Sequence, residues 1–207
     1  LLENAAITLK PAHYYALYHR FGADGEFLDL LLSRPELPPV VRIMQARRAA
    51  TNLNGLLQQR DWMGRGAAAE LVVDAEEHAT LDVLMAATAQ QRAMAVTYLI
   101  ENDLLTPSLI VRAACLGAME VVMECLAALS DQPLHRVRDQ MHHRFRSLHA
   151  RCGLPQSCYW TLQAACDVAR DEQEDGIRLT ADEFGAKLIE KLLTRYESMP
   201  AAEQPRN

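Results

Sequence analysis

The side chains best suited to chemistry lie in one basic segment, between Leu134 and Cys152. It contains five arginines and four histidines against a single acid, Asp139. Guanidinium and imidazolium groups donate hydrogen bonds to carboxylates and phosphates. The segment therefore indicates a face for an acidic partner or an anionic ligand. The candidate residues for such a face are Arg136, Arg138, His142, Arg144 and Arg146.

The simpler interpretation of the same segment is a solvated helix face. The positive charges of this face would compensate the acidic segments Glu70 to Asp82 and Asp167 to Asp175 within the same molecule. We favour this interpretation because exposed ion pairs are common and individually contribute little. A helix running through the whole segment would place His135, His142 and His149 in one stripe. We expect a break in that helix near His142 and His143.

Metal or cofactor binding is not expected from the basic segment. Histidines two helical turns apart are separated by about 10 Å and cannot share one ion. Only His149 and Cys152 are close enough on one face, and two ligands do not make a site. Arg151 and His149 could lower the pKa of Cys152. Because Cys152 also continues the apolar seam of Leu148, we predict an inert, packed thiol.

Other catalytic motifs are absent or incomplete in the sequence. His78 follows Glu76 and Glu77, whose charges would repel a phosphoryl donor, and the lysine and glycine typical of phosphorylated histidines are missing. Gly64-Arg65-Gly66 is too short for a phosphate loop and lacks its lysine. No HExxH, GxSxG or GxGxxG occurs. We therefore predict that the protein is not an enzyme.

Composition narrows the class of protein. Half of the 207 residues are hydrophobic and 23% are charged, which is typical of a globular chain. The net charge of −6 argues against a nucleic-acid binder. The five cysteines form no CxxC pair. No apolar run reaches the roughly 18 residues that a membrane-spanning helix needs. The first residues lack the pattern of a signal peptide, and a start at Leu1 rather than Met leads us to expect residues upstream. We expect a cytoplasmic protein.

Helical periodicity runs through almost the whole chain and predicts an all-α fold. Thr106 and Pro107 are typical of a helix start, and Gly117 is typical of a helix end. Thr180 and Glu183 have the spacing of a capping box. The helix beginning near Val40 is expected to be interrupted near Asn52 to Gly55, and a loop is expected over Asp61 to Gly66.

Helix starts marked by leucine and proline recur at irregular intervals, which favours stacked helical hairpins in a degenerate α-solenoid. We expect a single domain over residues 1–199, with a sub-division near residue 103. A frayed tail is expected over residues 200–207.

Four stretches resemble a bacterial family catalogued as domain of unknown function 2336. They are LSRPELPPVV, EEHATLDVLM, LLTPSLIVRAACLGAMEVVMECLA and SLHARCGLP. The resemblance covers Leu28 to Ala169 and leaves the last helix outside. It implies an all-α, HEAT-like protein of the bacterial cytoplasm, and it supplies no catalytic or ligand residues.

Two functions remain open at this point. The first is a non-catalytic interaction module, a scaffold or regulator whose partner is another protein, with homo-oligomers an open alternative. The second is a sensor that binds a small anionic molecule near Arg138, His142 and Arg144. No membrane partner is expected, and nucleic acid is third because of the net negative charge.

Overall fold

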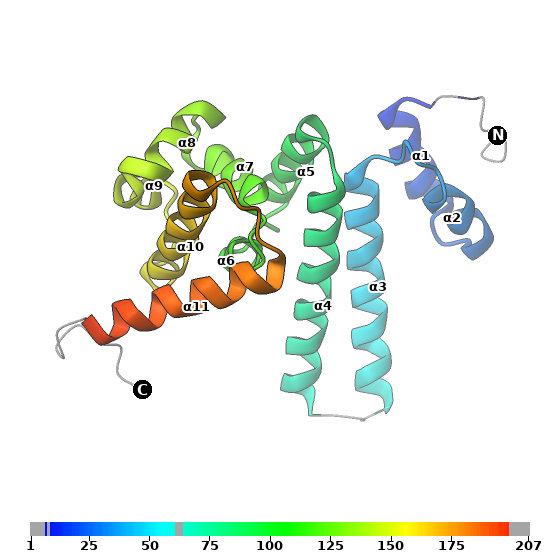
Figure 1. Ribbon diagram of the computed structural model, residues 1–207. Coiled ribbons are helices and arrows are strands. Elements are labelled where there is room, and N and C mark those ends of the chain that lie inside the picture. Colours follow the sequence, from blue (N-terminus) through cyan, green and yellow to red (C-terminus); the bar gives the residue numbers. More distant parts are fainter. Residues whose placement is uncertain (1–6, 8, 61–63, 199–207) are drawn as a thin grey trace. The chain divides into compact units, whose positions relative to one another are not determined.

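The computed structural model describes residues 7, 9–60 and 64–198 (Figure 1). Every regular element in these ranges is an α-helix, which confirms the predicted all-α class. Over the same ranges, no helix is both long enough and apolar enough to cross a membrane. Contacts divide the chain into an N-terminal unit, Leu1–Ala95, and a C-terminal unit, Val96–Asn207. The helix α5 (Ala89–Glu101) contains the boundary.

The N-terminal unit begins with two short helices, α1 (Pro11–Phe21) and α2 (Gly25–Leu32). The Asp24 side chain caps α2 by accepting a hydrogen bond from the Phe27 amide at 3.2 Å. Arg34 is buried, where it donates to the Ile7 carbonyl at 2.6 Å and to Glu36. The core around these helices comprises Tyr14, Tyr18, Leu31, Leu37 and Val41.

A long hairpin of two 22-residue helices follows, α3 (Pro39–Arg60) and α4 (Arg65–Ala86). The predicted interruption of α3 near Asn52 to Gly55 is wrong. The Thr51 hydroxyl donates to the Arg47 carbonyl at 3.0 Å, and the Gln58 amide donates to Asn54 at 3.1 Å. Asn54 is therefore satisfied by a side chain on the helix surface, and the bond from Thr51 to the preceding turn is compatible with a continuous helix. Of the predicted loop, Asp61 to Met63 lie outside the described residues. Arg65 and Gly66 already belong to α4, so this part of the prediction is wrong.

The C-terminal unit is arranged around α10 (Gln156–Asp175) (Figure 1). This helix packs against α6 (Pro107–Cys115), α7 (Met119–Ser130), α8 (Leu134–His143), α9 (Phe145–Arg151) and α11 (Ala181–Ser198). Leu109, Leu126, Leu148, Leu162 and Leu188 are fully buried and come from five different helices. One apolar core therefore connects elements far apart in the sequence.

The predicted helix boundaries of this unit are confirmed. The Thr106 hydroxyl accepts from the Leu109 amide at 3.0 Å, and Pro107 opens α6. Thr180 and Glu183 form the capping box: the Thr180 amide donates to the Glu183 carboxylate at 2.8 Å, which lowers the pKa of Glu183. Gly117 has a φ of 69° and ends α6 in the left-handed conformation.

Gly117 also allows close packing. A Cβ at this position would lie 2.9 Å from Cγ of Phe184, a buried residue of α11. The glycine is therefore required twice, once for its left-handed backbone and once for the space that the phenyl ring occupies.

We predict that Gly117→Ala lowers the free energy of unfolding by about 2–4 kcal/mol, because backbone strain and a steric conflict with Phe184 add together. Gly153→Ala is the matched control. Gly153 has a φ of 65°, but a Cβ there would meet nothing within 4 Å. Its expected loss is about 1–2 kcal/mol, from strain alone. Urea denaturation measures the free energy of unfolding of both variants. If the two variants lose the same amount, the role of Phe184 is contradicted.

Candidate functional site

The basic segment forms two short helices rather than one. The chain leaves helical geometry at Arg144 (φ −141°, ψ 37°), next to the break expected at His142 and His143. The Arg144 amide donates to the Gln140 carbonyl at 2.8 Å, while the Arg144 carbonyl accepts from the Leu148 amide at 3.2 Å. One residue therefore ends α8 and begins α9. The predicted break is confirmed.

The break separates the histidines. The stripe of His135, His142 and His149, which a single continuous helix would have formed, is therefore absent. His135 is exposed, whereas His149 is only 3% exposed. The His149 ring lies 6.0 Å from Phe145 and 5.1 Å from Tyr159 between ring centroids. Burial lowers the pKa of His149, partly opposed by a hydrogen bond to the Pro155 backbone. His149 is therefore part of the core.

Two of the five candidate residues line a small pocket between helices. Arg138 and His142 lie one turn apart on α8 and so share one face of that helix. The pocket has a volume of about 160 Å³. Its remaining lining comprises Met119 and Met123 of α7, Met141 of α8, and Cys166, Ala169 and Gln173 of α10. A cationic edge therefore adjoins a largely apolar interior built mainly from methionines.

The other three candidates do not join this pocket. Arg136, Arg144 and Arg146 are exposed on α8, at the break and on α9. The methionines were missed as a group by sequence reasoning because each falls in the apolar phase of its own helix, where packing is the usual role. Met119 and Met123 are four residues apart, which places them on one face of α7, and this spacing is the sequence pattern that relates two of the methionines.

Several acids of the two acidic segments form ion pairs outside the basic segment. Asp171 on α10 is bonded to Lys191 of α11 at 2.8 Å, and Asp167 to Arg170 at 2.9 Å. Glu76 on α4 is bonded to Arg47 of α3 at 2.8 Å. No ion pair within residues 9–60 and 64–198 includes a candidate arginine of the basic segment. The arginines of the basic face are therefore exposed to solvent, and the acids of these two segments that form ion pairs have other partners.

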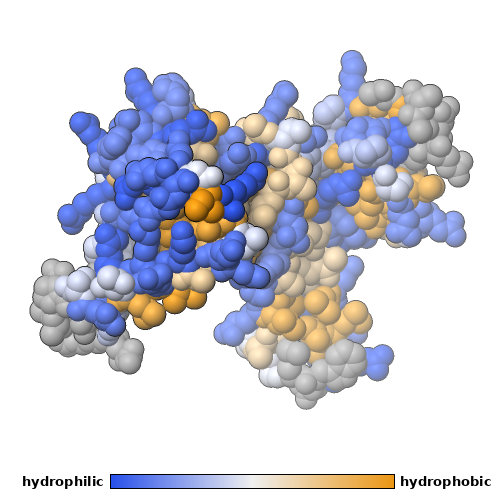
Figure 2. Space-filling model, viewed as in Figure 1, coloured by the Kyte–Doolittle hydropathy of each residue, from blue (hydrophilic) through white to orange (hydrophobic). Residues whose placement is uncertain are grey.

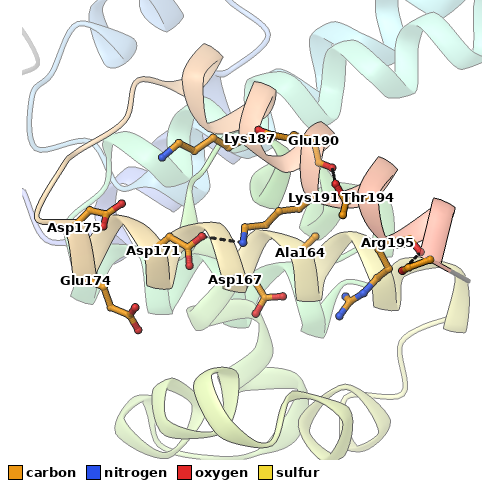
Figure 3. Close-up of a pocket in the computed structure, with 11 residues that line it drawn as sticks. Ala164, Asp167, Asp171, Glu174, Asp175, Lys187, Glu190, Lys191, Thr194 and Arg195 are labelled. Atoms are coloured by element: carbon orange, nitrogen blue, oxygen red, sulfur yellow. Dashed lines mark hydrogen bonds and ion pairs between the residues drawn. The ribbon is translucent and has the colours of Figure 1, made fainter.

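A larger groove of about 730 Å³ lies between α10 and α11 (Figure 3). Lys191 extends from α11 toward Asp171 on α10 and crosses it. Two hydroxyl groups line the groove, and both donate to carbonyls of α11 itself. Thr194 donates to the Glu190 carbonyl at 2.9 Å, and Ser198 donates to the Arg195 carbonyl at 2.8 Å. Arg195 stacks over Trp160, 4.7 Å from the ring centroid. The groove is a set of interhelical contacts, and none of the described residues that line it is a cysteine or a histidine.

The thiol and metal candidates carry no reactive geometry in the described residues. Burial raises the pKa of Cys152 to about 11, and this outweighs the nearby Arg151 charge. The prediction that Cys152 is packed in the core is therefore confirmed. His78 lies on α4 with Asp74 at 3.7 Å. Over the described ranges, no three His, Cys, Asp or Glu side chains lie close enough together to hold an ion.

These features define an all-α protein whose most distinctive site is a methionine-lined pocket edged by Arg138 and His142. The chain belongs to the family described as an uncharacterised protein conserved in bacteria (DUF2336), which it matches over residues 1–201. The resemblance found in the sequence is thus confirmed. The match includes α11, so the expectation that the last helix lies outside is wrong. No curated protein and no solved structure matches the chain significantly.

We predict that His149 makes stability depend on pH. Because burial disfavours the imidazolium, the unfolded chain binds the proton more strongly than the folded chain. The contribution of neutral His149 is complete above pH 6.5, the ordinary pKa, and is lost as the pH falls below it. Urea denaturation at about pH 7.5 and about pH 5.5 should show a smaller decrease for His149→Gln than for the wild type. Equal decreases would contradict this assignment.

Proposed function

We propose that the protein is a non-catalytic interaction module that binds a segment of another protein through the pocket between α7, α8 and α10. The supporting observation is the placement of Arg138 and His142 at the edge of a cavity lined by three methionines. The complementary ligand is an apolar side chain with Asp or Glu beside it. The apolar group would enter the cavity and the carboxylate would bind the arginine.

The size of the pocket favours a side chain over a free metabolite. Its volume is about 160 Å³. Typical sites for small molecules measure about 300–1,000 Å³. Methionines are flexible and polarizable, so they adapt to apolar side chains of different shape and are frequent on surfaces that bind several partners. A scaffold or regulator has use for such a surface.

The second candidate function is a sensor for a small anionic molecule at the same pocket. Arg138 could bind a carboxylate or phosphate in a bidentate manner. Native mass spectrometry at low and then at higher salt tests this candidate directly. A retained small mass that is lost in Arg138→Ala would support the sensor in place of the interaction module.

The proposal extends to architecture and location. Within the C-terminal unit, α6 packs on α7 and α10 packs on α11, and in the N-terminal unit α3 packs on α4. Such pairs support a HEAT-like stacking of helical hairpins. The five cysteines carry no disulfide, which supports a reducing, cytoplasmic environment.

Selection of displayed random peptides against the full chain tests the proposed function. We expect enrichment of peptides in which Leu, Phe or Met stands next to Asp or Glu. Arg138→Ala should weaken the selected peptides about 10- to 100-fold, because it removes a hydrogen-bonded charge. Fluorescence anisotropy measures the affinity.

The matched control is Arg146→Ala. Arg146 is exposed and belongs to the same basic segment, but it does not line the pocket. Peptide affinity should be nearly unchanged in this variant. If both variants weaken binding equally, the general charge of the basic face is responsible and the pocket has no specific role. If no peptide is enriched, the interaction module is contradicted.

A further inference from the structure

The outer half of the α3–α4 hairpin has a very small core of its own. Its buried side chains are Ala50 and Leu57 of α3 with Ala68 and Val72 of α4. Larger apolar residues beside them are exposed: Leu56 by 54%, Leu71 by 47% and Leu53 by 38%. Two helices alone bury only the stripes that face each other, so their flanks stay in water.

The exposed leucines share one flank of the hairpin. On α3, Ala49, Leu53 and Leu56 follow each other at steps of four and three, about a quarter turn or more from the buried stripe of Ala50 and Leu57. In an antiparallel pair, Leu71 of α4 is turned toward the same side. Figure 2 shows apolar side chains gathered at this end of the hairpin. Val73, which is 55% exposed, faces the opposite side.

The two helices carry opposite charge. Four arginines and no acid occur on α3. Five acids and one arginine occur on α4. Helical phase places Arg42 and Arg60 of α3 and Asp74 and Asp82 of α4 on the leucine side, whereas Arg47 and Glu76 pair with each other on the other side. The leucine flank therefore has arginines along α3 and aspartates along α4, which makes it complementary to itself.

We propose that this flank binds a second copy of the chain, so that two hairpins form an antiparallel four-helix bundle. A two-fold axis parallel to the helices places α3 of each copy on α4 of the other, with leucine on leucine and the arginines of α3 on the aspartates of α4. An axis across the helices would place arginines against arginines. Charge therefore selects the first arrangement.

Sedimentation velocity of the full chain tests the apolar part of the interface. The wild type should be a dimer at about 100 µM, and Leu56→Gln combined with Leu71→Gln should be a monomer, because exposed leucines are replaced without changing the charge. Val73→Gln is the matched control on the opposite flank and should remain a dimer. Circular dichroism checks that all three keep their helical content.

Charge reversal tests the pairing of α3 with α4. The first variant carries Arg48→Glu and Arg60→Glu, and the second carries Glu70→Lys and Asp82→Lys; all four residues are exposed. Each variant alone then places like charges opposite each other at the substituted positions and brings the net charge of one helix to zero, so its dimer should dissociate at least about tenfold more readily than the wild type. An equimolar mixture restores opposite charges across the interface and should form the heterodimer.

Three results would overturn the proposal. The first is a wild-type monomer at about 100 µM. The second is a dimer that survives the double leucine substitution or is lost equally in Val73→Gln. The third is a mixture of the charge-reversed variants that associates no better than either variant alone.

Discussion

The contact between Phe184 and the backbone at Gly117 holds the C-terminal unit in its observed arrangement. Gly117 turns the chain from α6 into α7, and the space left by its missing side chain receives the ring of Phe184 from α11. Since α10 also packs on both α6 and α11, this contact brings the last helix back to the start of the unit. The side of α10 that carries Cys166, Ala169 and Gln173 meets α7 and α8, where the methionine-lined pocket lies.

The parts of the fold that the sequence predicted are those governed by local chemistry. Thr106 and the Thr180–Glu183 box each satisfy amides within three residues, so their effect does not depend on distant packing. A positive φ at Gly117 follows from a local preference in the same way.

The parts of the fold that could not be predicted from the sequence depend on contacts between residues far apart in the chain. His149 resembles the other histidines of its segment, and only the rings of Phe145 and Tyr159 place it in the core. Asn52 to Gly55 have poor helix propensity, yet α3 continues because α4 supports it along its length. The pocket unites methionines of α7 and α8 with residues of α10, and no spacing in the sequence reveals that meeting.

Two interhelical contacts contain an ion pair. Asp171 meets Lys191 between α10 and α11, and Glu76 meets Arg47 between α3 and α4. Arg138 has no such partner within the described residues and stands beside an apolar pocket. An exposed arginine keeps its hydration until a ligand arrives, and a carboxylate next to an apolar group would then replace that water at small cost. Selectivity for such a ligand follows from the pairing of charge and cavity, because a carboxylate alone would leave the cavity empty and an apolar group alone would leave the arginine unpaired.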